Sequence, residues 1–237
     1  DPDSAAFATF AALLQSAAER GENLFLLGDF CEVWVGDDDD GPLAQAFRTL
    51  LTRLSKRTWI GLMHGNRDFL FAEQFASDTG VTLLPDPFRF GDRILLSHGD
   101  QYCVDDADYQ RMRAMLRSPE WQQSVMAQTL TERRALAADL RRQSTSANAN
   151  KAQNIMDVNA EAVAAAMHSH RCQLLIHGHT HRPAWHRGES FDRLVLGDWE
   201  ATAWVAQLGA DVSLAAAPTS ALREKIALQC LPLTASG

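Results

Sequence analysis

Four short apolar segments of this sequence each end in a glycine-containing turn that carries a side chain able to bind a metal ion. In chain order the motifs are Gly28-Asp29, Gly65-Asn66, His98-Gly99 and Gly178-His179. Carboxylate, amide oxygen and imidazole together suit Mn, Fe or Zn better than Ca or Mg, which prefer all-oxygen ligands. A glycine beside each ligand would let the backbone turn sharply and approach the ion closely. One such motif is usually only a turn, but four in one chain indicate a metal centre.

The histidines are unevenly distributed, since six of the eight lie between residues 168 and 186. In His179-Thr180-His181, a turn after a strand can direct both imidazoles toward neighbouring metal ions. His177 remains ambiguous, because alternation along the strand points it away from His179. Four histidines are interpreted as ordinary packed or solvated side chains: His64, His168, His170 and His186.

Strands and helices must alternate to place these turns together. Buried strands are predicted at 23–27, 58–63, 94–96 and 173–176, with helices at 4–20, 42–56 and 71–79 between them. A turn at 91–92 predicts a hairpin of 88–90 with 94–96, and further strands are expected at 184–186, 194–196 and 204–208. Long Arg- and Gln-rich helical segments fill 105–170. The pattern predicts an α/β layered sandwich with a helical insertion and with ligands at the strand ends.

Composition excludes several classes of protein. The 237 residues carry a net charge of −8, which argues against a non-specific nucleic-acid binder. Part of this charge is a cluster of Asp29, Glu32 and 37–40, where metal cations would offset some of the charge. The four cysteines form no Cys-x-x-Cys pair, so neither a disulfide framework nor a zinc-thiolate site is expected and a reducing cytoplasm is the simplest compartment. No segment approaches the ~20 apolar residues that span a bilayer, and no signal peptide opens the sequence. Any membrane contact is therefore expected to be peripheral.

In order, the motifs G-D-x-x-E, G-N-R-D, H-G-D and G-H-T-H resemble the calcineurin-like metallophosphoesterase superfamily. Longer stretches at 27–38, 64–70, 98–106 and 155–159 are similar to its UDP-2,3-diacylglucosamine pyrophosphatase family. The resemblance implies an α/β/β/α sandwich formed by 1–104 and 171–237, with a helical cap at 105–170 over a site for two Mn²⁺ ions. The implied reaction is attack of a metal-activated water on the α-phosphorus of UDP-2,3-diacylglucosamine. Its products would be UMP and 2,3-diacylglucosamine 1-phosphate, in lipid A biosynthesis.

The resemblance also implies roles for individual residues. Asp29 would bridge both ions; Asn66, His98 and His179 would complete one metal site, and His181 would serve the other. Arg67 would join the ligands Asp29, Asn66, His98 and His179 as a catalytic residue. The implied substrate contacts are Asn66, Arg67, Asp106, Ser144, Asn148, Lys151 and His179. Without the resemblance, Ser144, Asn148 and Lys151 would be interpreted as a solvated loop, and Asp106 as part of a helix N-cap.

One feature departs from the family, which begins with a strand followed by Asp-x-His that supplies two ligands. No such motif precedes the first predicted helix, and Asp1 and Asp3 are not substitutes. A truncated sequence and a natural loss both explain this, and we expect truncation because the first residue is not Met. Two other functions stay open. One is another dinuclear-metal phosphodiesterase or phosphomonoesterase, and the other is a non-catalytic scaffold with this fold.

The predicted cap combines basic side chains with apolar ones. Between 105 and 151 there are eight Arg or Lys residues, accompanied by Met, Leu, Val and Trp side chains. This combination suits a diacylated substrate taken from a membrane surface, although an amphipathic helix pair packed on the core would show it too. We expect the protein to act on a UDP-diacylglucosamine lipid, peripherally on the cytoplasmic side of the bacterial inner membrane. Neither nucleic acid nor an obligate protein partner is expected.

Overall fold

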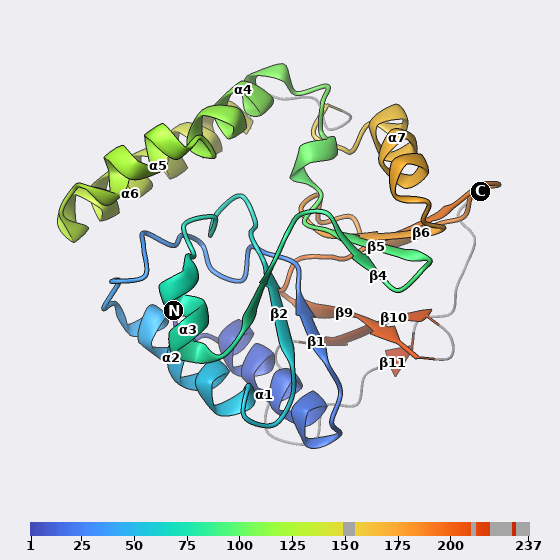
Figure 1. Ribbon diagram of the computed structural model, residues 1–237, viewed down its shortest axis with the longest axis horizontal. Helices are drawn as coiled ribbons and strands as arrows, with labels where there is room; N and C mark the ends of the chain where they lie inside the picture. The colour runs from blue at the N-terminus through green and yellow to red at the C-terminus, as the bar shows by residue number, and fades with distance from the viewer. Residues whose placement is uncertain (149–154, 210–211, 219–228, 231–237) are drawn as a thin grey trace.

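The fold is built from two facing layers of β-sheet, each covered by helices on its outer face (Figure 1). A computed structural model describes residues 1–148, 155–209, 212–218 and 229–230. A parallel sheet has the order β1-β2-β3, with β1 Leu24–Leu26, β2 Ile60–Met63 and β3 Thr82–Leu84. A mixed sheet has the order β4-β5-β6-β8-β7, with β4 Phe88–Phe90, β5 Ile94–Ser97, β6 Leu174–His177, β8 Asp192–Val195 and β7 Ala184–His186. A third sheet has the order β11-β10-β9, with β9 Thr202–Leu208, β10 Val212–Pro218 and β11 Gln229–Cys230.

Alternating side chains along the strands form the core. Met63 of β2 and Leu214 of β10 belong to one apolar cluster with Leu96 and Ile176, so the mixed sheet packs against both other sheets. Leu62 points the other way, into a cluster with α1 Ala5–Glu19, α2 Pro42–Leu54 and α3 Glu73–Thr79. Successive side chains of a strand face opposite sides of the sheet, which explains the two separate clusters.

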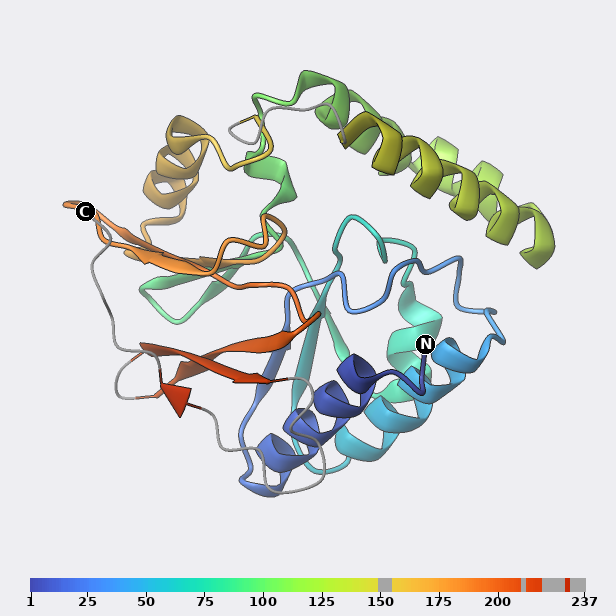
Figure 2. The ribbon, with the colours of Figure 1, turned by 180° about the vertical axis from the view of Figure 1, so that it is seen from behind.

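The segment after β5 leaves the sandwich and forms the cap. The short 3₁₀ helix η1 (Asp100–Tyr102) leads into α4 Ala107–Leu116, α5 Pro119–Met126 and α6 Leu130–Asn148. These three helices form an arm above the loops that follow β1 and β2, seen from both sides in Figures 1 and 2. The predicted insertion also contained α7 (Ala160–His170), which differs from the arm because its Val163 and Met167 pack on Leu95 and Leu175 of the mixed sheet. Among the residues described, no helix is long and apolar enough to cross a membrane.

The acidic residues after β1 fasten the cap to the core. Arg133 of α6 is buried and pairs with Asp38, while Arg134 pairs with Asp39 at 2.5 Å and with Asp40 at 2.7 Å. Arginine side chains therefore balance these three carboxylates. Arginines, and not metal cations, thus offset the charge of this part of the acidic cluster.

Candidate metal centre

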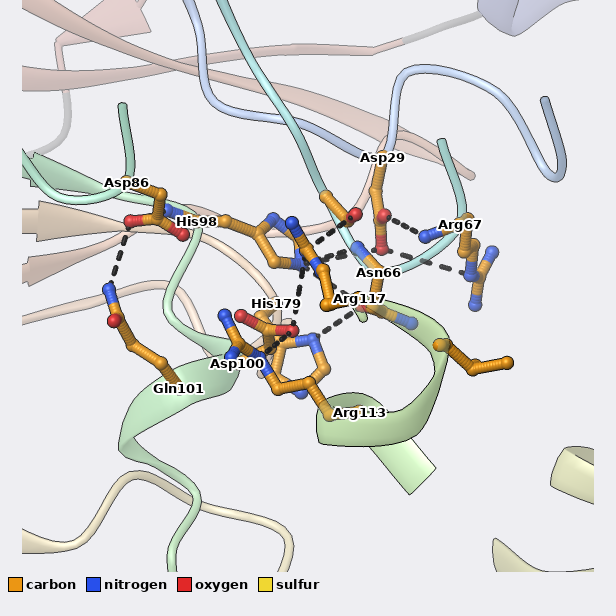
Figure 3. Close-up of polar contacts among 12 residues, drawn as sticks. Asp29, Asn66, Arg67, Asp86, His98, Asp100, Gln101, Arg113, Arg117 and His179 are labelled. Carbon is orange, nitrogen blue, oxygen red and sulfur yellow. Dashed lines mark hydrogen bonds and ion pairs between the residues drawn. The ribbon is translucent and has the colours of Figure 1, made fainter. Parts of the chain in front are cut away.

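Four predicted ligands meet where the strands of two sheets end (Figure 3). Asp29 follows β1, Asn66 follows β2, His98 follows β5 and His179 follows β6. Ligand atoms of Asp29, His98 and His179 all lie within 4.8 Å of one another. The amide oxygen Oδ1 of Asn66 is 3.0 Å from His98 Nε2 and 2.9 Å from His179 Nδ1. Loops that are up to 150 residues apart in the chain thus form one polar centre.

The donor atoms of this centre fit a divalent transition metal. Nδ1 of His98 is 2.9 Å from the carbonyl oxygen of Leu27, so Nδ1 is the nitrogen that carries the proton in the neutral ring. Nε2 then presents a lone pair toward Asn66 Oδ1 and, at 3.7 Å, toward Asp29 Oδ2. Acceptors that face one another in this way repel unless a cation or a proton lies between them. Mixed imidazole, carboxylate and amide ligands match Mn, Fe or Zn.

Close contact between two turns shapes the centre. Gly28 has a φ of +85°, and a Cβ atom there would lie 2.3 Å from the backbone nitrogen of Gly65. A Cβ on Gly65 would lie 2.1 Å from Oδ1 of Asp29. The contacts that exclude a side chain at Gly28 and Gly65 are therefore with the neighbouring ligand loop. The motifs alone had indicated a sharp turn and an approach of the backbone to an ion, and the positive φ of Gly28 agrees with the turn.

Two residues of the G-N-R-D motif tie the Asp29 and Asn66 loops together. The carboxylate of Asp68, which is fully buried, accepts from the backbone N–H groups of Gly65 at 2.7 Å and Phe30 at 3.0 Å. Burial, reinforced by the nearby charge of Asp29, raises the pKa of Asp68 to about 7. The backbone N–H of Arg67 donates to Asp29 Oδ1 at 2.8 Å. Asp68 was part of the quoted motif, but its side chain was not predicted to have a role.

Two other histidines lie outside the group formed by Asp29, His98 and His179. Nδ1 of His181 is 3.9 Å from Asp198 Oδ2, and its side chain is 41 % exposed. Its role as a ligand of a second ion stays a prediction. His177 is fully buried, with Nδ1 2.9 Å from the carbonyl oxygen of Gly178 and Nε2 3.3 Å from Arg193. His177 is therefore a packed residue of the core.

Metal binding at this centre is expected to release a proton from His98 at pH values below the pKa of that side chain. Burial by itself lowers the pKa of His98, but Asp29 and Asp100 beside it raise that pKa above its ordinary value. Burial and the charge of His98 lower the pKa of His179 to about 4, so His179 is already neutral. The ion needs the lone pair of His98, so the apparent metal affinity should increase with pH until the pKa of His98 is passed.

Calorimetric titration with Mn²⁺ in two buffers of different ionisation enthalpy measures this proton. The observed enthalpy should differ between the buffers near neutral pH and converge at alkaline pH. Equal enthalpies at every pH would contradict the assignment of His98 as a protonated ligand of the metal-free protein.

A cavity of about 380 Å³ lies between the metal centre and the cap. Asp29, Asn66, Arg67 and His179 line its core side, together with the exposed Glu32. The cap side combines apolar side chains, among them Met112, Leu116, Trp121, Leu136 and Leu140, with four arginines, Arg113, Arg117, Arg133 and Arg141. The cavity thus joins the metal centre to a cap wall that is both apolar and basic.

The structure describes the side chains of only some of the cap residues that were predicted to contact the substrate. Asp106 and Ser144 line the cavity, and Asp106 also accepts from the backbone N–H of Tyr109 as the N-cap of α4. Asn148 ends α6, but its side chain lies outside the described residues, as does all of Lys151. Arg141 was not predicted: like Arg67, it pairs with Oε2 of Glu32. Pairing between distant segments leaves no local signal in the sequence.

Known proteins resemble this chain over most of its length. The family described as "Calcineurin-like phosphoesterase" matches residues 3–183. A protein of Cellvibrio japonicus named UDP-2,3-diacylglucosamine hydrolase is 44% identical over 203 residues, covering 82% of this chain and 85% of that protein. A protein of the same name from Chromohalobacter salexigens is 46% identical over 198 residues, covering 80% of both chains. A solved structure of GAP50, described as the anchor in the inner membrane complex of Plasmodium, has a TM-score of 0.49 at 10% identity and covers 99% of this chain and 86% of that chain. All four ligand turns lie within the matched residues.

Proposed function

This chain belongs to the calcineurin-like phosphoesterase family, and we propose that it hydrolyses UDP-2,3-diacylglucosamine in lipid A biosynthesis. The observation that carries the proposal is the cavity that joins the metal centre to a cap wall of apolar and basic side chains. Relatives that bear the name of this hydrolase match the chain over about four fifths of its length. The resemblance inferred from the motifs is thus confirmed for the family, and the substrate follows from the relatives together with the cavity.

The metal is proposed to be Mn²⁺, held by Asp29, Asn66, His98 and His179. A divalent ion bound there would supply a Lewis acid for a phosphoryl oxygen and lower the pKa of a bound water. We further propose that Asp29 and His181 would hold a second ion.

Arg67 is the cation best placed to meet the diphosphate of the substrate. Its backbone N–H is fixed by Asp29, and its guanidinium group lines the cavity, where NH1 donates to Glu32 at 2.8 Å. A planar guanidinium can bind two phosphate oxygens at once and stabilise charge that develops on them. Hydrolysis at the α-phosphorus gives UMP and 2,3-diacylglucosamine 1-phosphate. Asp106 and Ser144 would contact the substrate from the cap, joined by Asn148 and Lys151.

The apolar side chains that line the cavity favour an acylated substrate over a small soluble phosphate ester. Two methionines and several leucines are among them, and methionine adapts its shape to flexible chains. Binding pockets for small molecules have volumes of about 300–1,000 Å³, and this cavity falls at the lower end of that range. It can therefore enclose part of the lipid while the nucleotide remains near the metal centre.

Release of UMP from UDP-2,3-diacylglucosamine tests the proposal directly. The Mn²⁺-loaded full-length protein should release UMP much faster than it hydrolyses bis-p-nitrophenyl phosphate. Preference for the small ester would favour another phosphodiesterase. Binding of Mn²⁺ without turnover of either compound would favour a non-catalytic scaffold.

We also propose that the protein associates peripherally with the cytoplasmic face of the inner membrane. The cap exposes Met115 and Met126, with exposed side-chain fractions of 50% and 42%, and the cation Arg111 lies nearby in α4. Basic and apolar side chains together bind anionic lipid surfaces. No obligate protein partner is proposed.

Vesicles provide the measurement for membrane association. The protein should co-sediment with phosphatidylglycerol vesicles at low salt and less so at high salt, because exposed charges are screened. Phosphatidylcholine vesicles are the control and should retain little protein. Failure to co-sediment with the anionic vesicles at any salt concentration would contradict the proposal.

A further inference from the structure

Asp100 is a fully buried carboxylate two residues beyond the metal ligand His98. Its Oδ2 atom accepts from the hydroxyl of Tyr109 at 2.9 Å and from Nε of Arg113 at 2.8 Å, and Arg117 NH2 is 3.7 Å away. The carboxylate is therefore tied to the first cap helix by two hydrogen bonds, one of which is also an ion pair with Arg113.

The three partners of Asp100 form one stripe on α4. Tyr109, Arg113 and Arg117 are spaced four residues apart, which places them on the same helix face. Nε2 of Gln110 adds a hydrogen bond of 2.9 Å to the backbone carbonyl of Asp100. Asp100 of the core thus binds the face of α4 that is turned toward the metal centre.

The same helix face also contacts the other ligand loop. NH2 of Arg117 donates at 2.9 Å to the carbonyl oxygen of Gly65, the residue before Asn66. The ring of Tyr109 lies 5.7 Å from the ring of His179. Figure 3 shows Arg113 and Arg117 beside Asp100, next to His98, Asn66 and His179. The α4 stripe therefore bridges the loops that supply three of the four ligands.

Charge makes this bridge sensitive to the ion. Two guanidinium groups, those of Arg113 and Arg117, lie beside a centre whose ligands suit a divalent cation. Without a counter-charge, these groups would repel the ion. Asp100 supplies that counter-charge from the loop of His98 itself.

We propose that Asp100 is a positioning residue that docks α4 on the ligand loops of His98 and Asn66, so that metal binding and the position of the cap are coupled. Metal binding, which orders these loops, should then stabilise α4 against the core. Coupling is reciprocal. The factor by which metal binding stabilises the docked position of α4 is therefore also the factor by which loss of the docking should weaken metal binding. This inference rests on the proposed function only in requiring a metal at the centre, and not on the identity of the substrate.

Hydrogen exchange of α4 and calorimetric Mn²⁺ binding test the coupling. In the parent protein, Mn²⁺ should slow amide exchange in α4. The Asp100→Asn variant should lose this metal-dependent protection and bind Mn²⁺ about tenfold more weakly, as for other residues that support metal ligands. Asp108→Asn is the matched control, because Asp108 lies on the same helix, is exposed and pairs only with Arg111 among the described residues. It should behave like the parent.

A merely structural role predicts a different result. Exchange in α4 would then rise equally with and without Mn²⁺, and the metal affinity of Asp100→Asn would equal that of the parent, which would overturn the inference. If Asp100→Asn does not fold, Tyr109→Phe decides, since it removes only the hydroxyl that donates to Asp100. That variant should lose part of the metal-dependent protection, and full retention would overturn the inference. Neither readout uses turnover, so a protein that shows the coupling without releasing UMP would refute the proposed function alone.

Discussion

Replacing Asp29 with asparagine is expected to lower kcat/KM for UDP-2,3-diacylglucosamine by more than about 100-fold. Residues that only support a metal ligand already contribute about 10–100-fold to affinity or activity, and Asp29 is proposed as a ligand of both ions. The substitution keeps the shape of the side chain and an acceptor for the backbone N–H of Arg67. It removes the one carboxylate in the group of three possible ligands. The loss should therefore come from the metal centre and not from the fold.

Metal content and thermal stability separate these causes. Asp29→Asn should contain much less Mn²⁺ after dialysis, while its melting temperature without metal stays close to that of the parent. Asp40→Asn is the matched control, because Asp40 lies in the loop after the same strand and pairs with Arg134 of the cap. The control should retain its activity and metal. Near-normal turnover of Asp29→Asn would contradict the assignment of the metal centre.

The parts of the fold that could be predicted are those that a few neighbouring residues in the sequence indicate. An N-cap predicts where α1 begins: Ser4 accepts from the backbone N–H of Phe7, as its position before the Ala-rich segment indicated. The hairpin of β4 and β5 follows from the turn at Gly91, which has a φ of +61°. The four ligand turns follow from apolar runs that end in glycine and a polar residue. Ligand turns at the ends of strands converge because these strands lie in two facing sheets.

Features that depend on tertiary contact could not be predicted. Arg133 is 95 residues from its partner Asp38, and nothing near either residue indicates the pair. Asp68 and Asp100 belong to the G-N-R-D and H-G-D motifs. Only the folded chain shows that both side chains are buried and which groups they bind. The packing of α7 on the mixed sheet could not be predicted, because a helix that packs on a sheet and one that belongs to a cap can have similar sequences. The structure thus adds the supporting contacts to a ligand set that the sequence had indicated.

The four glycines of the ligand turns are not equivalent, and Gly65→Ala is expected to be far more damaging than Gly178→Ala. The new Cβ would lie 2.1 Å from Asp29 Oδ1 and 2.3 Å from the backbone nitrogen of Asp29. The nitrogen belongs to the backbone of a ligand turn, so the Asp29 and Asn66 loops must separate. Overpacking of this kind costs about 1–3 kcal/mol of stability. Separation of two proposed ligands should also reduce Mn²⁺ binding and lower kcat/KM by more than about 100-fold, since even indirect loss of ligand support is costly.

Gly178→Ala is the matched control, because Gly178 precedes a ligand in the same kind of turn. The atom nearest to its new Cβ would be the carbonyl oxygen of His98 at 3.7 Å, an ordinary van der Waals distance. Its backbone lies outside the positive-φ region, so alanine can adopt it. Activity, Mn²⁺ affinity and melting temperature should all remain close to those of the parent. If both alanine variants lose metal binding equally, the glycines act through a shared approach to the ion, as the sequence alone had indicated. A loss confined to Gly65→Ala means that contact between the Asp29 and Asn66 loops is what requires glycine.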